Sequence, residues 1–161
     1  MNNVPPVVLT VCLGNICRSP TAEAALREAA AEVGVEVTVR SAGTGDWHIG
    51  SPPDERMTRA AAAEGLHLSG VGDQVTPDHL AAADLVLAMD RSNLADLRDL
   101  ADRSGVETSI HLYREFDPEA DGDLDVPDPY YGGHDGFAEV VRMVRRTAPA
   151  VVGHLATLRD R

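Results

Sequence analysis

The sequence predicts an α/β protein built as a three-layer sandwich, in which a four-stranded parallel sheet carries helices on both faces. Short apolar runs rich in β-branched residues, such as those over 7–11 and 85–89, are typical of strands buried on both faces. Helical stretches with one apolar side alternate with these runs, which is the order that a parallel sheet requires. A length of 161 residues fits one compact domain, which we expect to span residues 1–161.

The elements are expected in a regular order along the chain. A loop follows the first strand, and Ser19 and Pro20 then have the residue types of a helix N-cap and a first helical position, while Gly34 is typical of a helix end. In such a sheet, ligands bind beyond the carboxyl ends of the strands. We further expect strands over 35–40, 85–89 and 110–113, a loop over 43–53, helices over 54–64 and 77–83, a helix after Ser92, and a long helix with apolar residues from Phe137 to Leu155.

The composition excludes several classes of function. Acidic side chains outnumber basic ones 26 to 14, for a formal net charge of -12, and this balance argues against nucleic-acid binding. The chain contains no lysine. A Walker A lysine, a pyridoxal Schiff base and a lysine nucleophile are therefore all excluded.

The start of the chain and the two cysteines indicate the cellular compartment and the role of the thiols. The apolar run over 4–11 is too short to span a membrane and has no positively charged segment before it, so we expect a cytoplasmic monomer with no signal peptide and no membrane segment. Cys12 and Cys17 lie too close together to cross-link a fold, and they have no partners at zinc spacing. We expect a chemical role for these thiols, with no metal and no cofactor.

Residues 12–19 join the first strand to the first helix and favour the binding of an anion. The backbone N–H groups of such a loop converge with the N-terminus of the helix that follows it. Gly14 and Asn15 suit the positive φ angles that a tight cradle requires. The sequence therefore predicts an anion site at the end of the first strand.

Cys12 is the candidate nucleophile at this site. It lies at the strand end, where the helix dipole and the backbone N–H groups favour a thiolate. Arg18 can offer a planar guanidinium to two phosphate oxygens, and Ser19 can donate its hydroxyl to the thiolate. The alternative is that Cys12 is a small buried apolar residue and Arg18 a surface charge, because the bare spacing is a weak signal. The strand, loop and helix context favours the catalytic interpretation.

The segment from Val11 to Glu23 resembles the phosphate-binding loop of the low-molecular-weight protein tyrosine phosphatases. The resemblance covers essentially the whole chain and implies a metal-independent phosphatase that forms a phosphocysteine on Cys12. Phosphotyrosine proteins are the implied partners, and inorganic phosphate and other oxyanions are the implied inhibitors. The matching segments that follow, in the family's order, are Ser41-Ala42-Gly43, Gly50 with Pro52-Pro53-Asp54, Met89-Asp90 with Ser92-Asn93-Leu94, and Asp128-Pro129-Tyr130-Tyr131-Gly132. The implied phosphate-binding residues are Leu13, Gly14, Asn15, Ile16, Cys17, Arg18 and Ser19.

Asp128 is the candidate proton donor. Cleavage of a phosphate monoester leaves an alkoxide or phenoxide, so an acid is needed near the leaving oxygen, and a carboxyl on a mobile loop can supply it. The resemblance gives this role to the aspartate of Asp128-Pro129, which would then also activate the water that hydrolyses the phosphocysteine. The alternative is an ordinary Asp-Pro turn.

Aromatic residues are expected to wall the substrate pocket. Trp47, Tyr130 and Tyr131 lie in loops that can face one opening, and aromatic walls suit a phenyl ring. The resemblance adds Leu13 to these walls. The resemblance also makes Ile16 informative about the substrate. An isoleucine at this position resembles the tyrosine phosphatases of the family, whereas a threonine resembles its arginine phosphatases.

Asn15, Ser19 and Ser41 are expected to support the phosphate-binding loop from behind. The sequence departs from the family in this region. Gly70 stands where a histidine usually fixes the loop asparagine, and Asp73 stands where an arginine is expected. We predict an active enzyme with a softer loop.

Several alternatives stay open at the level of sequence. Residues 117–128 imitate a calcium-binding loop, but Asp128 ends the pattern beside Pro127 where a glutamate is expected. Arsenate reduction on the same scaffold requires cysteines beyond Cys17, and none follows it. A phosphate-responsive binding protein would keep the phosphate-binding loop but would not hydrolyse a substrate. Cys17 can form a disulfide with Cys12 and so protect the nucleophile from irreversible oxidation. No ligand spacing relates His48, His79, His111, His134 and His154, so we expect them to be solvated or to cap helices.

Overall fold

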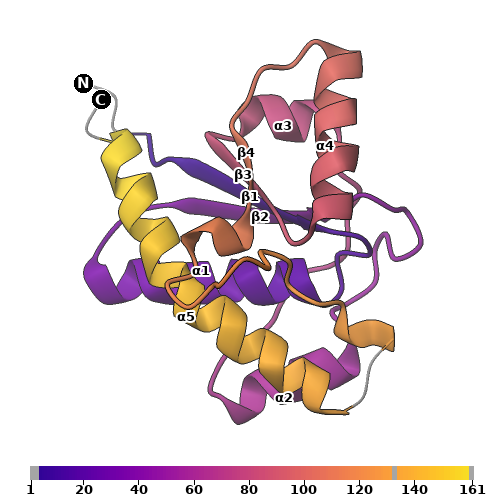
Figure 1. Cartoon of the computed structure of the whole chain (residues 1–161), viewed down its shortest axis with the longest axis vertical. Helices are drawn as coiled ribbons and strands as arrows, with labels where there is room; N and C mark the ends of the chain where they lie inside the picture. The colour runs from indigo at the N-terminus through magenta and orange to yellow at the C-terminus, as the bar shows by residue number, and fades with distance from the viewer. Residues whose placement is uncertain (1–3, 132–133, 160–161) are drawn as a thin grey trace.

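A computed structural model of the chain describes residues 4–131 and 134–159. The strands are β1 (Val7–Cys12), β2 (Thr38–Gly43), β3 (Leu85–Ala88) and β4 (Ile110–Leu112). The helices are α1 (Arg18–Val33), α2 (Glu55–Ala63), α3 (Pro77–Ala82), α4 (Arg91–Ser104) and α5 (His134–Arg159), with short 3₁₀ helices η1 (Tyr113–Phe116) and η2 (Pro129–Tyr131). Within the described residues, the strands form one parallel sheet in the order β2-β1-β3-β4 (Figure 1).

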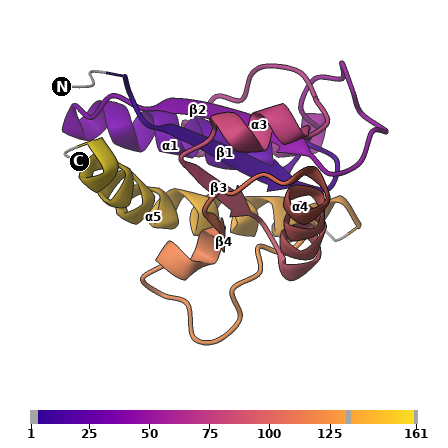
Figure 2. The same cartoon turned by 90° about the horizontal axis from the view of Figure 1, so that it is seen from above.

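Helices cover both faces of this sheet and bury two apolar cores. In Figure 1, α3 and α4 lie above the sheet and α1, α2 and α5 below it, and Figure 2 shows the same layers from above. Leu9 and Val11 of β1 pack into the core on the α3 and α4 side, whereas Val8 and Cys12 pack into the core on the α1 and α5 side. The predicted three-layer fold is confirmed, and the alternation along β1 directs Cys12 toward α1.

The start of α1 differs from the sequence prediction. The helix begins at Arg18, so Ser19 is not its N-cap, and Cys17 occupies the cap position without a side-chain hydrogen bond. The reason is that the Ser19 hydroxyl lies against Cys12 inside the preceding loop. The predicted end is confirmed, because Gly34 follows the helix with a left-handed φ of 69°.

The second and fourth strands also differ from the prediction at their ends. β2 begins at Thr38 and not at residue 35, because the Thr38 N–H donates to the Pro6 carbonyl at 2.9 Å and so sets the register with β1. β4 ends at Leu112, and Tyr113 belongs to η1, where its phenol donates to the Val144 carbonyl of α5 at 2.7 Å. These non-local contacts override the local strand preference.

The carboxyl end of β2 packs directly against the loop that follows β1. Gly43 permits this approach, because a Cβ on it would lie 2.8 Å from the Leu13 carbonyl oxygen and 3.1 Å from the Asn15 nitrogen. The Gly45 N–H also donates to the Leu13 carbonyl at 2.9 Å. The backbone of one strand end therefore holds the shape of the neighbouring loop.

Arg114 of η1 fixes the acidic segment that leads to Asp128. Its Nη1 donates to the carbonyls of Asp123 at 2.8 Å and Asp125 at 3.0 Å, and its Nε donates to Asp117 at 2.9 Å. Arg146 of α5 binds the same Asp117 carboxylate at 3.0 Å. Because Arg114 and Arg146 already take this carboxylate, the first acid of the calcium-like pattern serves as an anchor for the loop.

The Asp117 anchor predicts a loss of stability in acid. Burial by itself would raise the pKa of Asp117, but hydrogen bonds from Arg146, the Glu119 N–H and Arg114 hold it at about 2, below its ordinary 3.8. A carboxyl with a lowered folded-state pKa stabilises the fold above its unfolded pKa and loses that contribution as pH falls. We expect the free energy of unfolding to drop by about 2 kcal/mol through this group between about pH 5 and pH 2.

Urea unfolding across that pH range measures the contribution of Asp117. Asp117→Asn is the matched variant, because it has no proton to gain and its stability curve should be flatter by the same amount. Parallel curves for the two proteins would contradict a stabilising carboxylate at this position.

Candidate active site

The loop between β1 and α1 wraps around the sulfur of Cys12. The Oγ atom of Ser19 lies 3.0 Å from the Cys12 Sγ atom, and the Asn15 N–H donates to the same sulfur at 3.2 Å. Cys12 is only 2% exposed and stands at the carboxyl end of β1, before the N-terminus of α1. Donors and a helix N-terminus around a sulfur stabilise its thiolate.

The side chain of Asn15 forms hydrogen bonds that hold the shape of this loop. Its φ of 58° is left-handed, and no other non-glycine residue in the described ranges has a positive φ. Its Nδ2 donates to the Ser19 Oγ at 2.8 Å, and its Oδ1 accepts from the Asp73 N–H at 2.9 Å. The Ser19 hydroxyl can donate to the Cys12 sulfur at 3.0 Å or to the Ala42 carbonyl at 3.5 Å, and a thiolate at Cys12 can only accept. A backbone N–H thus supports Asn15 in a chain that has Gly70 in place of the expected histidine.

Replacing Asn15 by alanine is expected to lower both activity and stability. Two side-chain hydrogen bonds disappear, and alanine adopts a left-handed φ at a cost of about 1–2 kcal/mol. We expect kcat to fall about tenfold and the free energy of unfolding to fall by about 2–3 kcal/mol. Steady-state kinetics and urea unfolding measure the two effects.

Asn15→Gly is the control for this variant, because glycine relieves the backbone cost without restoring the amide. We expect it to recover part of the stability and none of the turnover. An unchanged kcat in both variants would show that the Asn15 amide does not support the reactive loop.

Arg18 is fully inside the site and carries a charge there. It is 2% exposed, and its Nη1 donates to Asp90 at 2.6 Å and to the Val126 carbonyl at 3.0 Å, while Nη2 lies 3.5 Å from Asp128. Burial by itself would lower the pKa of Arg18, but Cys12, Asp90 and Asp128 raise it above the ordinary value. The guanidinium therefore stays positive beside the sulfur and is aimed by Asp90.

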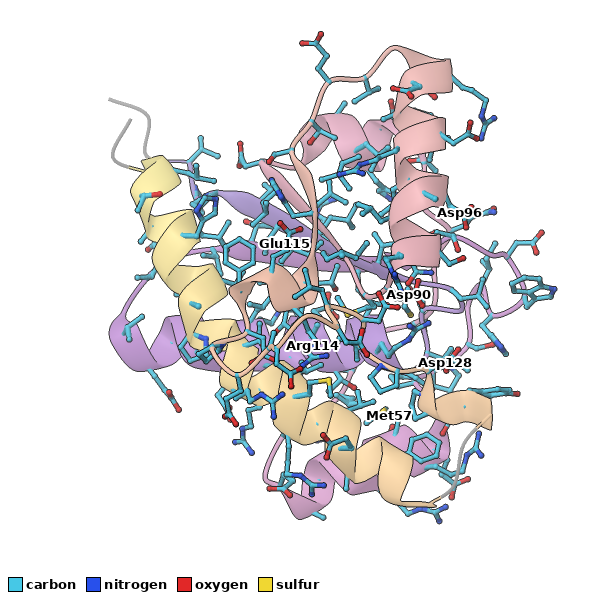
Figure 3. All side chains as sticks on the ribbon, in the orientation of Figure 1. Met57, Asp90, Asp96, Arg114, Glu115 and Asp128 are labelled. Atoms are coloured by element: carbon cyan, nitrogen blue, oxygen red, sulfur yellow. The ribbon has the colours of Figure 1, made fainter. Side chains whose placement is uncertain are left out.

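Asp128 approaches the same site from the loop before η2. Figure 3 shows Asp90 and Asp128 at one edge of the sheet, Asp90 after the end of β3 and Asp128 ahead of the turn of η2. One Asp128 oxygen accepts from the Tyr130 N–H at 3.0 Å, and the other faces Arg18. The side chain remains 28% exposed, so the carboxyl can reach both the pocket and solvent.

These groups surround a pocket of about 320 Å³, a volume that suits a phenyl ring bearing a phosphate. Its floor consists of the loop and its cysteine, and Asp128 stands at its side. Its apolar and aromatic walls are Leu13, Ile16, Trp47, His48 and Tyr130. The arrangement provides a nucleophile, a cation and an acid around one small space.

Comparison with known proteins identifies the family. The model of the low molecular weight phosphotyrosine protein phosphatases matches residues 7–160. The chain belongs to this family. A low molecular weight protein-tyrosine-phosphatase of Streptomyces coelicolor is 44% identical over 156 residues, which cover 95% of this chain and 93% of that protein. Both the phosphatase class and the fold predicted from the sequence are confirmed.

Solved structures agree with this membership of the low-molecular-weight phosphatase family. The structure of YfkJ from Bacillus subtilis has a TM-score of 0.87 and 35% identity, covering 98% of this chain and 99% of that one. The Drosophila arginine phosphatase has a TM-score of 0.85 and 28% identity, covering 91% of this chain and 96% of that one. The same fold therefore carries two substrate classes, and the substrate of this phosphatase must be argued from its pocket.

The structure brings most of the predicted site residues of this phosphatase together. Asn15 and Ser19 do not line the pocket but contact the Cys12 sulfur from behind it, and two further residues are exceptions. Ser41 lies on β2 opposite Thr10, and it lines a different cavity. The backbone of Tyr131 belongs to η2, but its side chain lies outside the described residues. The residues that do meet around the pocket are Cys12, Leu13, Gly14, Ile16, Cys17, Arg18, Trp47, Asp128 and Tyr130.

Sequence reasoning missed two residues of the site. His48 is not simply solvated, because it lines the pocket and its ring covers Gly14, where a Cβ would lie 3.1 Å from the His48 Cδ2. Asp90 orients Arg18, although the sequence indicated it only as part of a motif. The available signal for Asp90 was its place directly after β3, since polar residues at parallel strand ends converge.

Cys17 is a buried thiol beside the site. Burial, together with the charges of Asp54 and Cys12, raises the pKa of Cys17 far above the ordinary value, and both cysteines are free thiols. Among the described residues, no three histidine, cysteine, aspartate or glutamate side chains are placed to hold a metal ion. No helix in the described ranges has the length and apolar character needed to cross a bilayer.

Proposed function

We propose that the protein hydrolyses phosphotyrosine in proteins through a phosphocysteine intermediate on Cys12. The observation that carries this proposal is the pocket of about 320 Å³, around which Cys12, Arg18 and Asp128 all lie. Its aromatic walls accept a phenyl ring, and its buried guanidinium accepts a phosphate. No residue of another chain is needed to complete the site, which supports a monomeric enzyme.

In the first step, the Cys12 thiolate attacks the phosphorus and forms a sulfur–phosphorus bond, while the bond from phosphorus to the phenolic oxygen breaks. The carboxyl of Asp128 gives its proton to that oxygen, so tyrosine leaves as a neutral phenol. Arg18 and the loop N–H groups hold the equatorial oxygens. Because Asp90 and the Val126 carbonyl take Nη1, the other guanidinium nitrogens bind the phosphate.

In the second step, the Asp128 carboxylate takes a proton from water, and the water oxygen attacks the phosphocysteine. The sulfur–phosphorus bond breaks, inorganic phosphate forms, and Cys12 leaves as a thiolate. Ser19 supports this step, because its hydroxyl donates to the leaving sulfur across 3.0 Å. Inorganic phosphate and similar oxyanions fit the same loop and act as competitive inhibitors.

The pocket favours tyrosine over arginine as the phosphorylated side chain. Ile16 is 7% exposed and places an apolar side chain in the pocket wall, and this side chain offers no hydrogen-bond acceptor to a guanidinium. Tyr130 adds an aromatic wall that suits a phenyl ring, and Arg56, which is paired with Asp54 at 3.2 Å, lies 5.2 Å from the centre of the Tyr130 ring and so already occupies a cation position on it.

An assay against three substrates tests the proposed function. Phosphate release is measured from peptides that carry phosphotyrosine, phosphoserine or phosphoarginine, in the presence of a chelator. We expect kcat/KM for the phosphotyrosine peptide to exceed the other two by at least about 100-fold. Faster release from phosphoarginine would assign the other substrate class, and loss of all activity in chelator would contradict the metal-independent mechanism.

We place the enzyme in the cytoplasm, because a thiolate nucleophile with a second thiol five positions away works only while it is reduced.

A further inference from the structure

A second cavity, of about 580 Å³, lies on the other side of a loop that walls the active site. Trp47 and His48 line the active-site pocket, whereas the next two residues, Ile49 and Gly50, line this second cavity. We call residues 47–50 the dividing loop. Asn15 also lines the second cavity, from behind the phosphate-binding loop. The two spaces are therefore close neighbours.

The outer edge of β2 borders the second cavity. β2 is an edge strand of the sheet, and its Thr38 N–H points to β1 and donates to Pro6. Because the backbone groups of successive strand residues point to opposite sides, residues 40 and 42 also face β1, and residues 39, 41 and 43 face outward. An outward-facing edge residue can pair with another strand.

Among the described residues, the outward-facing backbone groups of β2 form hydrogen bonds at Val39 and Gly43 but not at Ser41 between them. Arg27 donates to the Val39 carbonyl at 2.9 Å. Gly43 donates to the Asp73 carbonyl at 2.8 Å and accepts from the Val75 N–H at 2.8 Å. Between them, the backbone N–H and C=O of Ser41 have no partner among the residues that the structure describes, and Ser41 lines the cavity.

An exposed apolar path connects the two spaces. Trp47 is 69% exposed, Ile49 is 56% exposed and Val71 is 65% exposed. The dividing loop is fastened to the segment of Val71, because the Gly50 N–H donates to the Gly72 carbonyl at 2.8 Å. Trp47 belongs to the active-site wall, and Ile49 and Val71 belong to the lining of the second cavity. A chain that leaves the active site along this path meets these three apolar side chains before it reaches β2, where the cavity lining also includes the charged residues Arg40 and Asp73.

We propose that an extended, apolar segment of the substrate protein, adjacent to its phosphotyrosine, crosses the dividing loop and pairs with Ser41 as an added strand. This inference rests on the proposed function. The added strand runs antiparallel to β2, so that one residue of the segment donates its N–H to the Ser41 carbonyl and accepts from the Ser41 N–H. Its apolar neighbours cover Ile49 and Val71. The substrate class is thus a phosphotyrosine that flanks a strand-forming segment, not an isolated phosphotyrosine.

Kinetics with phosphopeptides of two lengths test the docking. The core peptide is a phosphotyrosine with two residues on each side, and two long peptides extend this core by eight alternating valine and threonine residues, one before and one after it. Eight extended residues span roughly 26 Å, which is ample to reach an adjacent strand. We expect one long peptide to have a KM about tenfold below that of the core, at the same kcat, as two hydrogen bonds and apolar contact provide.

N-methylation of the long peptide, one residue at a time, isolates the backbone pairing. It removes a single N–H and leaves the side chains and net charge unchanged. We expect methylation of the residue opposite Ser41 to return KM to the value of the core. A KM that is insensitive to methylation at every residue would overturn the strand pairing.

Replacing apolar residues of the path by aspartate tests the same docking from the side of the enzyme. Ile49→Asp with Val71→Asp is expected to raise KM for the long peptide about fivefold and to leave the core peptide and p-nitrophenyl phosphate unchanged. Val33→Asp is the control, because Val33 is equally exposed at 65% but ends α1. Equal KM values for core and long peptides would overturn the docking alone. Turnover of p-nitrophenyl phosphate with none of any phosphotyrosine peptide would overturn the proposed function instead.

Discussion

Replacing Cys12 by serine is expected to lower kcat by about 10⁴-fold or more while phosphate binding is retained. An alcohol is in general a far weaker acid than a thiol and a poorer nucleophile, so serine does not replace the attacking sulfur. The groups that hold phosphate remain, because Arg18 keeps its bonds to Asp90 and Val126. Phosphate release measures turnover, and calorimetry with inorganic phosphate or vanadate measures binding.

Cys17→Ser is the matched control for this change. Cys17 is 4% exposed, and burial raises its pKa, so it stays a protonated thiol and has no part in the proposed chemistry. We expect it to retain kcat within about threefold. If Cys12→Ser kept kcat within about tenfold of the wild type, or if Cys17→Ser lost as much as Cys12→Ser, the nucleophile would be misassigned. Oxyanion binding without turnover in the wild type would support the alternative of a binding protein.

The sequence could predict those residues of the site that lie close together along the chain. Residues 12–19 are consecutive, so their order alone places Cys12, Asn15 and Arg18 between a strand and a helix. Asp128 is distant in sequence, and only its motif indicated it. The structure adds the physical reason for its place, because Arg114 binds the carbonyls of Asp123 and Asp125 and so fixes the loop that leads to it.

The remaining contacts of the site depend on backbone hydrogen-bonding groups and on packing between elements, and residue types do not reveal these. The absence of a histidine at Gly70 suggested weak support for Asn15, yet the donor there is the Asp73 N–H, which any residue except proline could supply. His48 covers Gly14 only because β2 and its loop pack on the phosphate-binding loop. Ser41 was expected behind that loop, but the register with β1 places it opposite Thr10, where it lines the second cavity.

Asp128→Asn is expected to lower kcat for phosphotyrosine peptides by about 10³-fold, within the range of general acid catalysis. Asparagine keeps the shape of the side chain but has no proton to give to the phenolic oxygen. The loss in the first step should be much smaller with p-nitrophenyl phosphate, because p-nitrophenolate leaves without protonation. Its second step still needs a base, so phosphocysteine should accumulate and appear as a burst of p-nitrophenol in rapid-mixing experiments.

Asp125→Asn separates this chemical role from a structural one. Asp125 lies on the same segment, but its carboxylate accepts from the Arg91 N–H at 3.0 Å and is not part of the pocket lining. We expect this variant to keep the wild-type ratio of rates for the two substrates. If Asp128→Asn slowed both substrates equally and gave no burst, the carboxylate would act only by holding Arg18 at 3.5 Å. A leaving-group dependence that appears in Asp128→Asn and not in Asp125→Asn therefore assigns the donated proton to the Asp128 carboxyl.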